Sequence, residues 1–182
     1  MAVPSSIRCE RTACGGLVLR ALPRHAAAMP DDNLIAVGRL GRSAEAELFA
    51  RYAVRLRPRL ALTELADGRG TPAEIKRREA DALLAALPAG AFAIVLDMAG
   101  EAPGSAGLAT RLAAWRGTAR PLAFLIGGAE GLAARVLARA DAVLSLGPFT
   151  WPHALARVML AEQLYRAQSI AAGHPYHRAG RP

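Results

Sequence analysis

Four side chains near the end of the chain have the chemistry of proton transfer and of base stacking. His153 and His177 carry imidazoles, which titrate near neutral pH and can act as general bases. Tyr176 could stack on a nucleobase, and Arg178 could hold a phosphate or a carboxylate. A structural or RNA-contacting role fits each histidine equally well. Because no cysteine lies near these histidines and their spacing does not repeat, we expect no metal site.

Three segments that contain glycine follow apolar runs that we predict to be strands. They are Leu96-Asp97-Met98-Ala99-Gly100, the stretch from Gly127 to Gly131, and the stretch from Gly147 to His153. Ligands of parallel sheets bind beyond the carboxyl ends of the strands, and glycine lets a backbone approach a ligand closely. A pair of glycines is also typical of a simple tight turn. No phosphate-binding fingerprint follows any predicted strand, which disfavours a nucleotide-binding enzyme of another class.

The elements that position these segments alternate along the chain. Apolar runs bounded by Gly, Pro or Asp are typical of strands buried on both faces of a parallel sheet. The predicted strands are 33–37, 59–65, 91–96, 121–126 and 142–146, and the predicted helices are 43–57, 72–87, 105–116, 130–139 and 151–172. Thr71 to Glu74 form a capping box with Pro72 at the first helical position, and Thr150 is the expected N-cap of the last helix. The pattern predicts an α/β fold with helices on both faces of the sheet.

Composition points to one domain and to an anionic partner. The chain has 182 residues, of which 53% are hydrophobic, enough for a single globular core. Its 23 basic residues against 15 acidic ones give a formal charge of +8. Apart from Lys76 the basic residues are arginines, which favour nucleic acid, although a solvated basic surface would look the same. No run is apolar enough to span a membrane, and the only cysteines, Cys9 and Cys14, fit a protein of the reducing cytoplasm.

The N-terminal segment differs from the rest of the chain. We expect residues 1–32 to be a disordered extension and residues 33–182 to form the folded domain. Arg20 interrupts the apolar run from Gly15 to Leu22, which argues against a signal peptide, while a transit peptide or a basic tail that contacts RNA stays open. Because the first strand begins four residues after Met29, we expect Met29 to be the natural start.

Several stretches together resemble the RlmH family of SPOUT methyltransferases. The similarity runs from about Leu34 to Arg178 and is strongest from Phe124 to Gly131, from Thr150 to His153, and in the segments 162–167 and 174–178. It implies a SPOUT-type parallel sheet whose C-terminal part is threaded into a trefoil knot, an arrangement that general folding rules would exclude.

The resemblance also implies an activity, a cofactor and a partner subunit. Family members bind S-adenosylmethionine and methylate N3 of a pseudouridine in 23S ribosomal RNA of the large subunit or assembled ribosome. The matching cofactor positions are Leu96, Gly128, Gly147, Pro148, Phe149, Thr150, Trp151 and Pro152. Members of the family are homodimers in which the C-terminal tail helps to complete the site of the partner subunit. The resemblance therefore implies that Tyr176, His177 and Arg178 act on the cofactor site of the partner. Two alternatives stay open, namely a ribosome-associated RNA-binding protein without turnover and a SPOUT methyltransferase that modifies another RNA.

Overall fold

The computed structural model describes residues 10–11, 17–18 and 31–177. Two short strands, β1 (Glu10–Arg11) and β2 (Leu17–Val18), pair antiparallel with each other. The rest of the predicted N-terminal extension, including Met29, lies outside the described residues, and so does Arg178. The extension and the start at Met29 therefore stay predictions. In the described part of the chain, no helix has the length and apolar character needed to cross a membrane.

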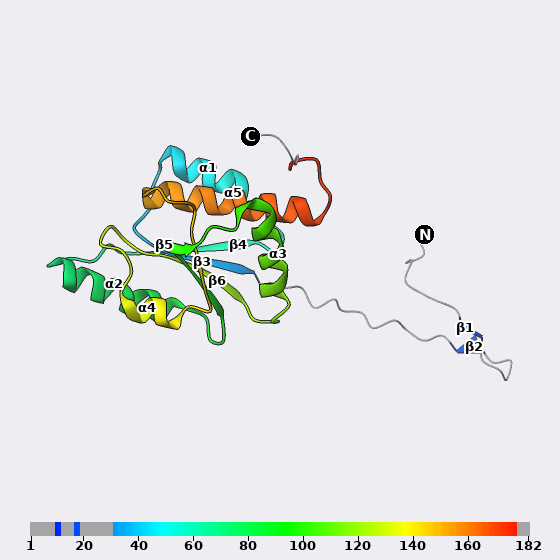
Figure 1. The fold of residues 1–182 in the computed structure, drawn as a ribbon, viewed down its shortest axis with the longest axis horizontal. Helices are drawn as coiled ribbons and strands as arrows, with labels where there is room; N and C mark the ends of the chain where they lie inside the picture. The colour runs from blue at the N-terminus through cyan, green and yellow to red at the C-terminus, as the bar shows by residue number, and fades with distance from the viewer. Residues whose placement is uncertain (1–9, 12–16, 19–30, 178–182) are drawn as a thin grey trace.

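The centre of the domain is a five-stranded sheet in which every strand runs parallel to its neighbours (Figure 1). The strands are β3 (Asp32–Val37), β4 (Leu60–Leu65), β5 (Phe92–Glu101), β6 (Leu122–Ile126) and β7 (Ala142–Leu144). Their order across the sheet is β4-β3-β6-β5-β7. All residues of β6 are buried, because this strand lies in the middle of the sheet with helices on both sides. The predicted parallel α/β architecture is thus confirmed.

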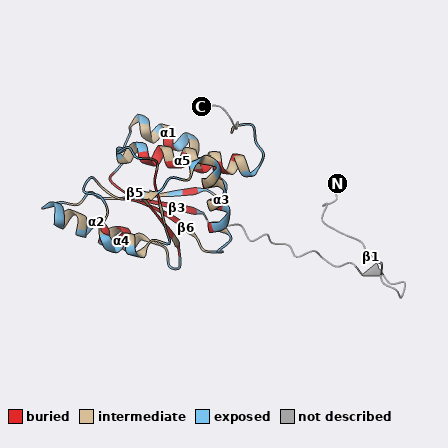
Figure 2. Cartoon of the chain, viewed as in Figure 1, coloured by how far each residue is buried: buried red, intermediate tan, exposed pale blue. Residues whose placement is uncertain are grey.

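Helices cover both faces of the sheet. On one face lie α1 (Ala44–Ala53), α3 (Gly104–Arg116) and α5 (His153–Ala171), and on the other lie α2 (Pro72–Ala86) and α4 (Ala134–Arg139) (Figure 1). Successive strand residues point to opposite faces, so Leu34 belongs to the core under α1, α3 and α5 while Ile35 belongs to the core under α2 and α4. Buried residues accordingly gather in the strands and on the helix faces that touch them (Figure 2).

The helix start predicted from the capping box at Thr71 is confirmed. The backbone N–H of Thr71 donates to Glu74 Oε2 at 2.8 Å, and the backbone N–H of Glu74 donates to Thr71 Oγ1 at 3.4 Å. Ser43 caps α1 in the same manner through the N–H of Ala46. The predicted extension of α1 to Arg57 is wrong. Leu56 turns into the core instead, with 1% of its surface exposed, and Pro58 disfavours helical backbone at the preceding residue.

The last part of β5 differs from the prediction and shapes the edge of the sheet. We expected a strand that ends at Leu96, but β5 continues to Glu101, and both Leu96 and Glu101 pair with Leu144 of β7. The intervening residues therefore bulge away from β7. Gly100 permits the return, because a Cβ at this position would lie 2.8 Å from the carbonyl carbon of Leu144. β7 itself ends at Leu144, two residues earlier than predicted.

Two helices begin later than predicted. Gly131 has φ +74°, a left-handed conformation that interrupts a helix, so α4 begins at Ala134 rather than at residue 130. The prediction that Thr150 caps the last helix is wrong, since Pro152 is the N-cap of α5 and no side chain caps it. The Thr150 hydroxyl instead donates to Met98 Sδ at 3.5 Å.

A buried arginine fixes the first turns of α5 to the sheet. Arg157 is 2% exposed, and its Nη1 donates to Glu64 Oε1 at 3.0 Å. Its Nη2 donates to the carbonyl oxygens of Gly38, at 2.9 Å, and of Val37. Burial lowers the pKa of Arg157 from its ordinary value, while the nearby carboxylate of Glu64 acts in the opposite direction. Arg157 therefore joins α5 to the carboxyl ends of β3 and β4.

Candidate functional site

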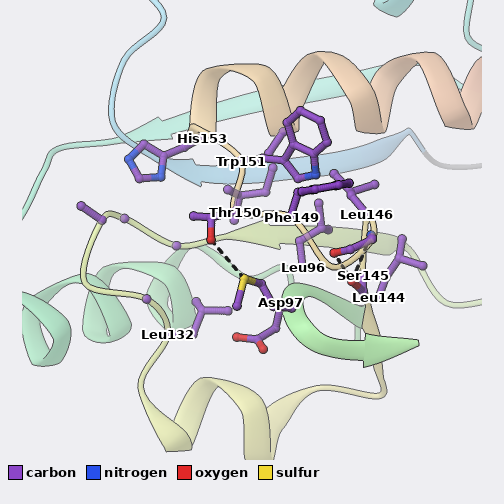
Figure 3. A pocket seen from close by; sticks show the side chains of 18 of the residues that line it. Leu96, Asp97, Leu132, Leu144, Ser145, Leu146, Phe149, Thr150, Trp151 and His153 are labelled. Atoms are coloured by element: carbon purple, nitrogen blue, oxygen red, sulfur yellow. Dashed lines mark hydrogen bonds between the residues drawn. The ribbon is translucent and has the colours of Figure 1, made fainter. Parts of the chain in front are cut away.

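A cavity of about 430 Å³ lies at the carboxyl ends of β5, β6 and β7 (Figure 3). Its walls come from the three glycine-bearing segments expected from the sequence, together with the start of α5. The lining residues are 96–98, 126–132, 144–147, 149–151, His153 and Ala156. The volume is within the range of roughly 300–1,000 Å³ that is usual for small-molecule sites. The structure thus brings three loops, far apart in the sequence, to one pocket.

Most of the cofactor residues predicted from the sequence line this cavity. Leu96, Gly128, Gly147 and the run Phe149 to Trp151 are among the lining residues, whereas Pro148 and Pro152 are not. His153, one of the two histidines predicted as a general base, also lines the cavity, at the first residue of α5.

The two glycines after β6 are in close contact with side chains of the protein. A Cβ at Gly127 would lie 2.8 Å from Cδ2 of Leu132, which lines the cavity, and a Cβ at Gly128 would lie 2.5 Å from Oε2 of Glu79, which does not. We expected the glycines to make room for a ligand. The structure shows that they make room for side chains of the protein.

Two aromatic side chains stand at the edge of the cavity rather than in the core. Phe149 is 69% exposed and Trp151 is 37% exposed. Their ring centroids are 6.1 Å apart in an edge-on arrangement (Figure 3). Met98, which contacts Thr150 and also lines the cavity, is 61% exposed. Apolar surface is therefore available to a ligand or partner at this position.

The turn after β7 is held by a serine that the sequence analysis did not single out. The backbone N–H of Gly147 donates to Ser145 Oγ at 3.1 Å, and Ser145 Oγ lies at the same distance from the carbonyl oxygen of Gly147. Gly147 has φ +104°, a conformation that only glycine adopts readily. A serine two residues before a glycine is the sequence signal that could have pointed to this turn, because a serine hydroxyl can accept from the backbone N–H two residues on.

The charge of the cavity is opposite to that of the whole protein. Among the residues that the structure describes, its lining includes the carboxylates of Asp97 and Glu130 but no lysine or arginine, and His153 is the only basic side chain. Asp97 Oδ1 accepts a hydrogen bond from the N–H of Ala99 at 2.9 Å, which fixes the carboxylate at the wall. Because carboxylates in a partly enclosed site favour positive charge, the cavity suits a cationic ligand better than a phosphate.

The C-terminal tail lies against α5, away from the cavity. The Tyr176 hydroxyl donates to Glu162 Oε1 at 2.9 Å, and its ring packs edge-on against Tyr165 with centroids 4.8 Å apart. The guanidinium of Arg166 lies 4.9 Å from the centroid of the Tyr176 ring and pairs with Glu162. Burial raises the pKa of the Tyr176 hydroxyl above its ordinary value, and its hydrogen bonds add to this effect.

Neither Tyr176 nor His177 lines the cavity of its own chain. Glu162, which holds Tyr176, is nine residues beyond His153 on α5, or about 14 Å along the helix axis. His177 Nδ1 is buried without a hydrogen-bond partner among the described residues. Tyr176 and His177 therefore lie apart from the cavity of the same subunit.

The fold and site define an α/β domain with a small-molecule cavity at the carboxyl edge of a parallel sheet. Residues 32–177 match the family described as "Predicted SPOUT methyltransferase". A protein of Acidiphilium cryptum named "Ribosomal RNA large subunit methyltransferase H" is 64% identical over 150 residues, which cover 82% of this chain and 95% of that protein. Proteins with the same name from Gluconacetobacter diazotrophicus and Rhodospirillum centenum are 64% and 52% identical, covering 82% and 80% of this chain and 99% and 97% of theirs.

The chain belongs to the SPOUT methyltransferase family, as the family match and these relatives show. A crystal structure of the SpoU methyltransferase AviRb from Streptomyces viridochromogenes with the cofactor AdoMet aligns with 85% of this chain and 65% of that one, at 11% identity and a TM-score of 0.43. As a member of this family, the protein is an enzyme that takes its methyl group from S-adenosylmethionine, a sulfonium cation. The carboxylates of the cavity wall fit such a cofactor, as does the absence of basic side chains other than His153 among the described residues that line it.

Proposed function

We propose that this methyltransferase modifies the large ribosomal subunit, where it methylates N3 of a pseudouridine in 23S ribosomal RNA. The observation that carries the proposal is the 64% identity to two proteins named as methyltransferases of large-subunit ribosomal RNA. The formal charge of +8 supports a polyanionic substrate, because phosphate contacts supply much of the affinity for RNA. A substrate of this kind places the enzyme in the bacterial cytoplasm.

Different residues around the cavity bind the cofactor and accept the proton. When bound, S-adenosylmethionine supplies the methyl group, and the loops at 96–98, 127–131 and 147–151 hold it at the sheet edge. Holding the nucleophile in line with the methyl carbon supplies much of the rate. The N3 proton of the base must leave, and His153 is the imidazole at the cavity that can accept it.

We propose further that the enzyme works as a homodimer whose sites are shared. Tyr176 and His177 lie beside the middle of α5 and not at the cavity of their own chain. A second subunit that brings its tail to the cavity would place Tyr176, His177 and Arg178 near the target base. Such an arrangement also gives His177 Nδ1, which is buried and unpaired among the described residues, a partner across the interface.

The same proposal includes the trefoil knot of the family. After β7 at one edge of the sheet, the chain forms the turn around Gly147 and then places α5 between α1 and α3 on the face of the sheet. Arg157 joins α5 to the ends of β3 and β4, which lie toward the opposite edge of the sheet from β7. A path of this kind is compatible with threading of the C-terminal segment through the loops at the cavity.

The substrate is tested with ribosomal particles from a host strain that lacks the gene. Purified protein and methyl-labelled S-adenosylmethionine are added to large subunits, to whole ribosomes and to free 23S RNA, and labelled nucleotides are mapped by mass spectrometry. We expect one N3-methylpseudouridine in assembled particles and little label in free RNA. Label in another RNA would favour a different SPOUT substrate, and binding of the cofactor without any label would favour a ribosome-associated protein without turnover.

The shared site is tested by mixing two inactive variants. One subunit lacks the residues from Tyr176 onward, and the other carries Gly128→Val, which places a branched side chain against Glu79. With random pairing of subunits, about half of the dimers contain one subunit of each variant, and each such dimer has one intact site of two. We therefore expect activity to return to about a quarter of the wild-type value. No recovery, with both variants folded and dimeric, would contradict the shared site. Asp81→Asn, an exposed substitution on α2, is the control that should keep full activity.

A further inference from the structure

A third carboxylate lies directly behind the cavity. Glu79 is on the inner face of α2 and is only 5% exposed, although glutamate is rarely buried. Its Oε1 accepts a hydrogen bond at 3.0 Å from the backbone N–H of Gly68, in the loop after β4. Its Oε2 is buried and has no hydrogen-bond partner in the described part of the chain.

The contact between Glu79 and Gly128 places this carboxylate next to the cofactor site. A Cβ on Gly128 would lie 2.5 Å from Oε2, 2.8 Å from Oε1 and 2.9 Å from Cδ of Glu79, so the carboxylate rests against one side of Gly128. Gly128 lines the cavity, whereas Glu79 does not. Gly128 is therefore in contact with the carboxylate and with the space inside the cavity.

A buried carboxylate with an unpaired oxygen is unfavourable unless a positive charge compensates it. Because Glu79 is buried, its charge is poorly screened by solvent and can act on another charge over several ångströms. No arginine or lysine forms an ion pair with Glu79 among the described residues. The cationic cofactor of this family is the charge that could fill that role. In methyl transfer the methyl carbon bonds to N3 of the base, whose proton passes to a base such as His153. The S–CH₃ bond breaks with both electrons left on sulfur, so the sulfonium becomes a neutral thioether.

We propose that Glu79 determines how strongly the site prefers S-adenosylmethionine over its product, S-adenosylhomocysteine. Held behind Gly128, its carboxylate stabilises the sulfonium charge through space and gives nothing comparable to the neutral thioether. Release of the product is thereby favoured after each transfer. The inference rests on the binding of the cofactor at this cavity, and it adds a residue that does not touch the cofactor.

The test compares the binding of both compounds to a variant that lacks only the charge. Glu79→Gln keeps the size of the side chain and the acceptor for Gly68. We expect its dissociation constant for S-adenosylmethionine, measured by isothermal titration calorimetry, to rise about tenfold, and that for S-adenosylhomocysteine to change less than twofold. The control is Asp81→Asn, which changes the net charge equally from an exposed position on the same helix and should alter neither constant.

A second pair of variants covers the case in which Glu79→Gln does not fold. Glu79→Asp keeps the charge and Glu79→Asn removes it in a smaller side chain, so the aspartate variant should keep the preference for the cofactor and the asparagine variant should lose it. Equal weakening of both ligands in the neutral variants would show a purely structural role and overturn the proposal, and so would no change. Failure of the wild-type protein to bind S-adenosylmethionine would instead refute the placement of the cofactor in this cavity.

Discussion

Replacing Arg157 by alanine is expected to be among the most destabilising single changes in this protein. The side chain is 2% exposed and joins α5 to Glu64 and to the carbonyl oxygens of Val37 and Gly38. Arg157→Ala removes the guanidinium and leaves a void together with acceptors that have lost their donor. Glu64 keeps one partner, because its Oε1 also accepts from the backbone N–H of Leu40 at 2.7 Å.

The size of the effect follows from the burial of the pair. Removing one partner of a buried ion pair costs about 3–5 kcal/mol, because the remaining polar groups stay in the protein without compensation. Glu64 is itself partly exposed, with 29% of its side-chain surface accessible, so we expect the lower end, about 3 kcal/mol. For a protein of this size each kcal/mol lowers the melting temperature by about 2–4 °C, which predicts a decrease of about 6–12 °C.

Thermal unfolding followed by circular dichroism measures this decrease, and urea unfolding gives the free energy. Arg135→Ala is the matched control, because Arg135 pairs with Asp81 where both side chains are largely exposed, and we expect a loss of less than about 1 kcal/mol. The double variant Arg157→Met with Glu64→Gln removes both charges, fills the void and keeps an acceptor for the N–H of Leu40, so it should recover part of the loss. A decrease below about 1 kcal/mol for Arg157→Ala would refute the argument that this side chain anchors α5.

Three further changes test other contacts. Gly128→Ala should lower stability by about 1–3 kcal/mol because its Cβ meets the carboxylate of Glu79, and Glu79→Ala in the same chain should remove most of that penalty in urea unfolding. Gly100→Ala should cost about 1–3 kcal/mol without such a rescue, since its Cβ meets backbone atoms of β7; unchanged unfolding would contradict this packing. Hydrogen bonds from Arg120 lower the pKa of Asp141 in the folded state. The ionised Asp141 therefore stabilises the folded protein above about pH 4, and this stabilisation is lost as the pH falls through the lowered pKa. Asp141→Asn should therefore cost about 1 kcal/mol at pH 7 and progressively less in acid, as measured by unfolding at several pH values, and a loss that does not depend on pH would show that the charge is not involved.

Local sequence was sufficient for the elements and for the place of the site. Apolar runs such as the one that became β6 can be satisfied only in a sheet covered on both faces, and Thr71 to Glu74 contain every group of their capping box within four residues. Two of the three glycine-bearing segments follow strands of one parallel sheet, the third forms the bulge near the end of β5, and the carboxyl ends of such strands necessarily meet at one edge. The sequence therefore predicted a cavity there, and the resemblance to the RlmH family indicated its cofactor.

Only the tertiary structure decided which side chains surround that cavity and what holds them. Thr150 has the residue type and the position expected of a helix cap, but the turn after β7 places its hydroxyl against Met98, in the bulge of β5. In the sequence, Glu79 is one of several charged residues of α2. Its contact with Gly128 arises only from the packing of α2 against the sheet. Such contacts join residues far apart in the chain, and their geometry is determined by the packing of the whole domain rather than by any local pattern.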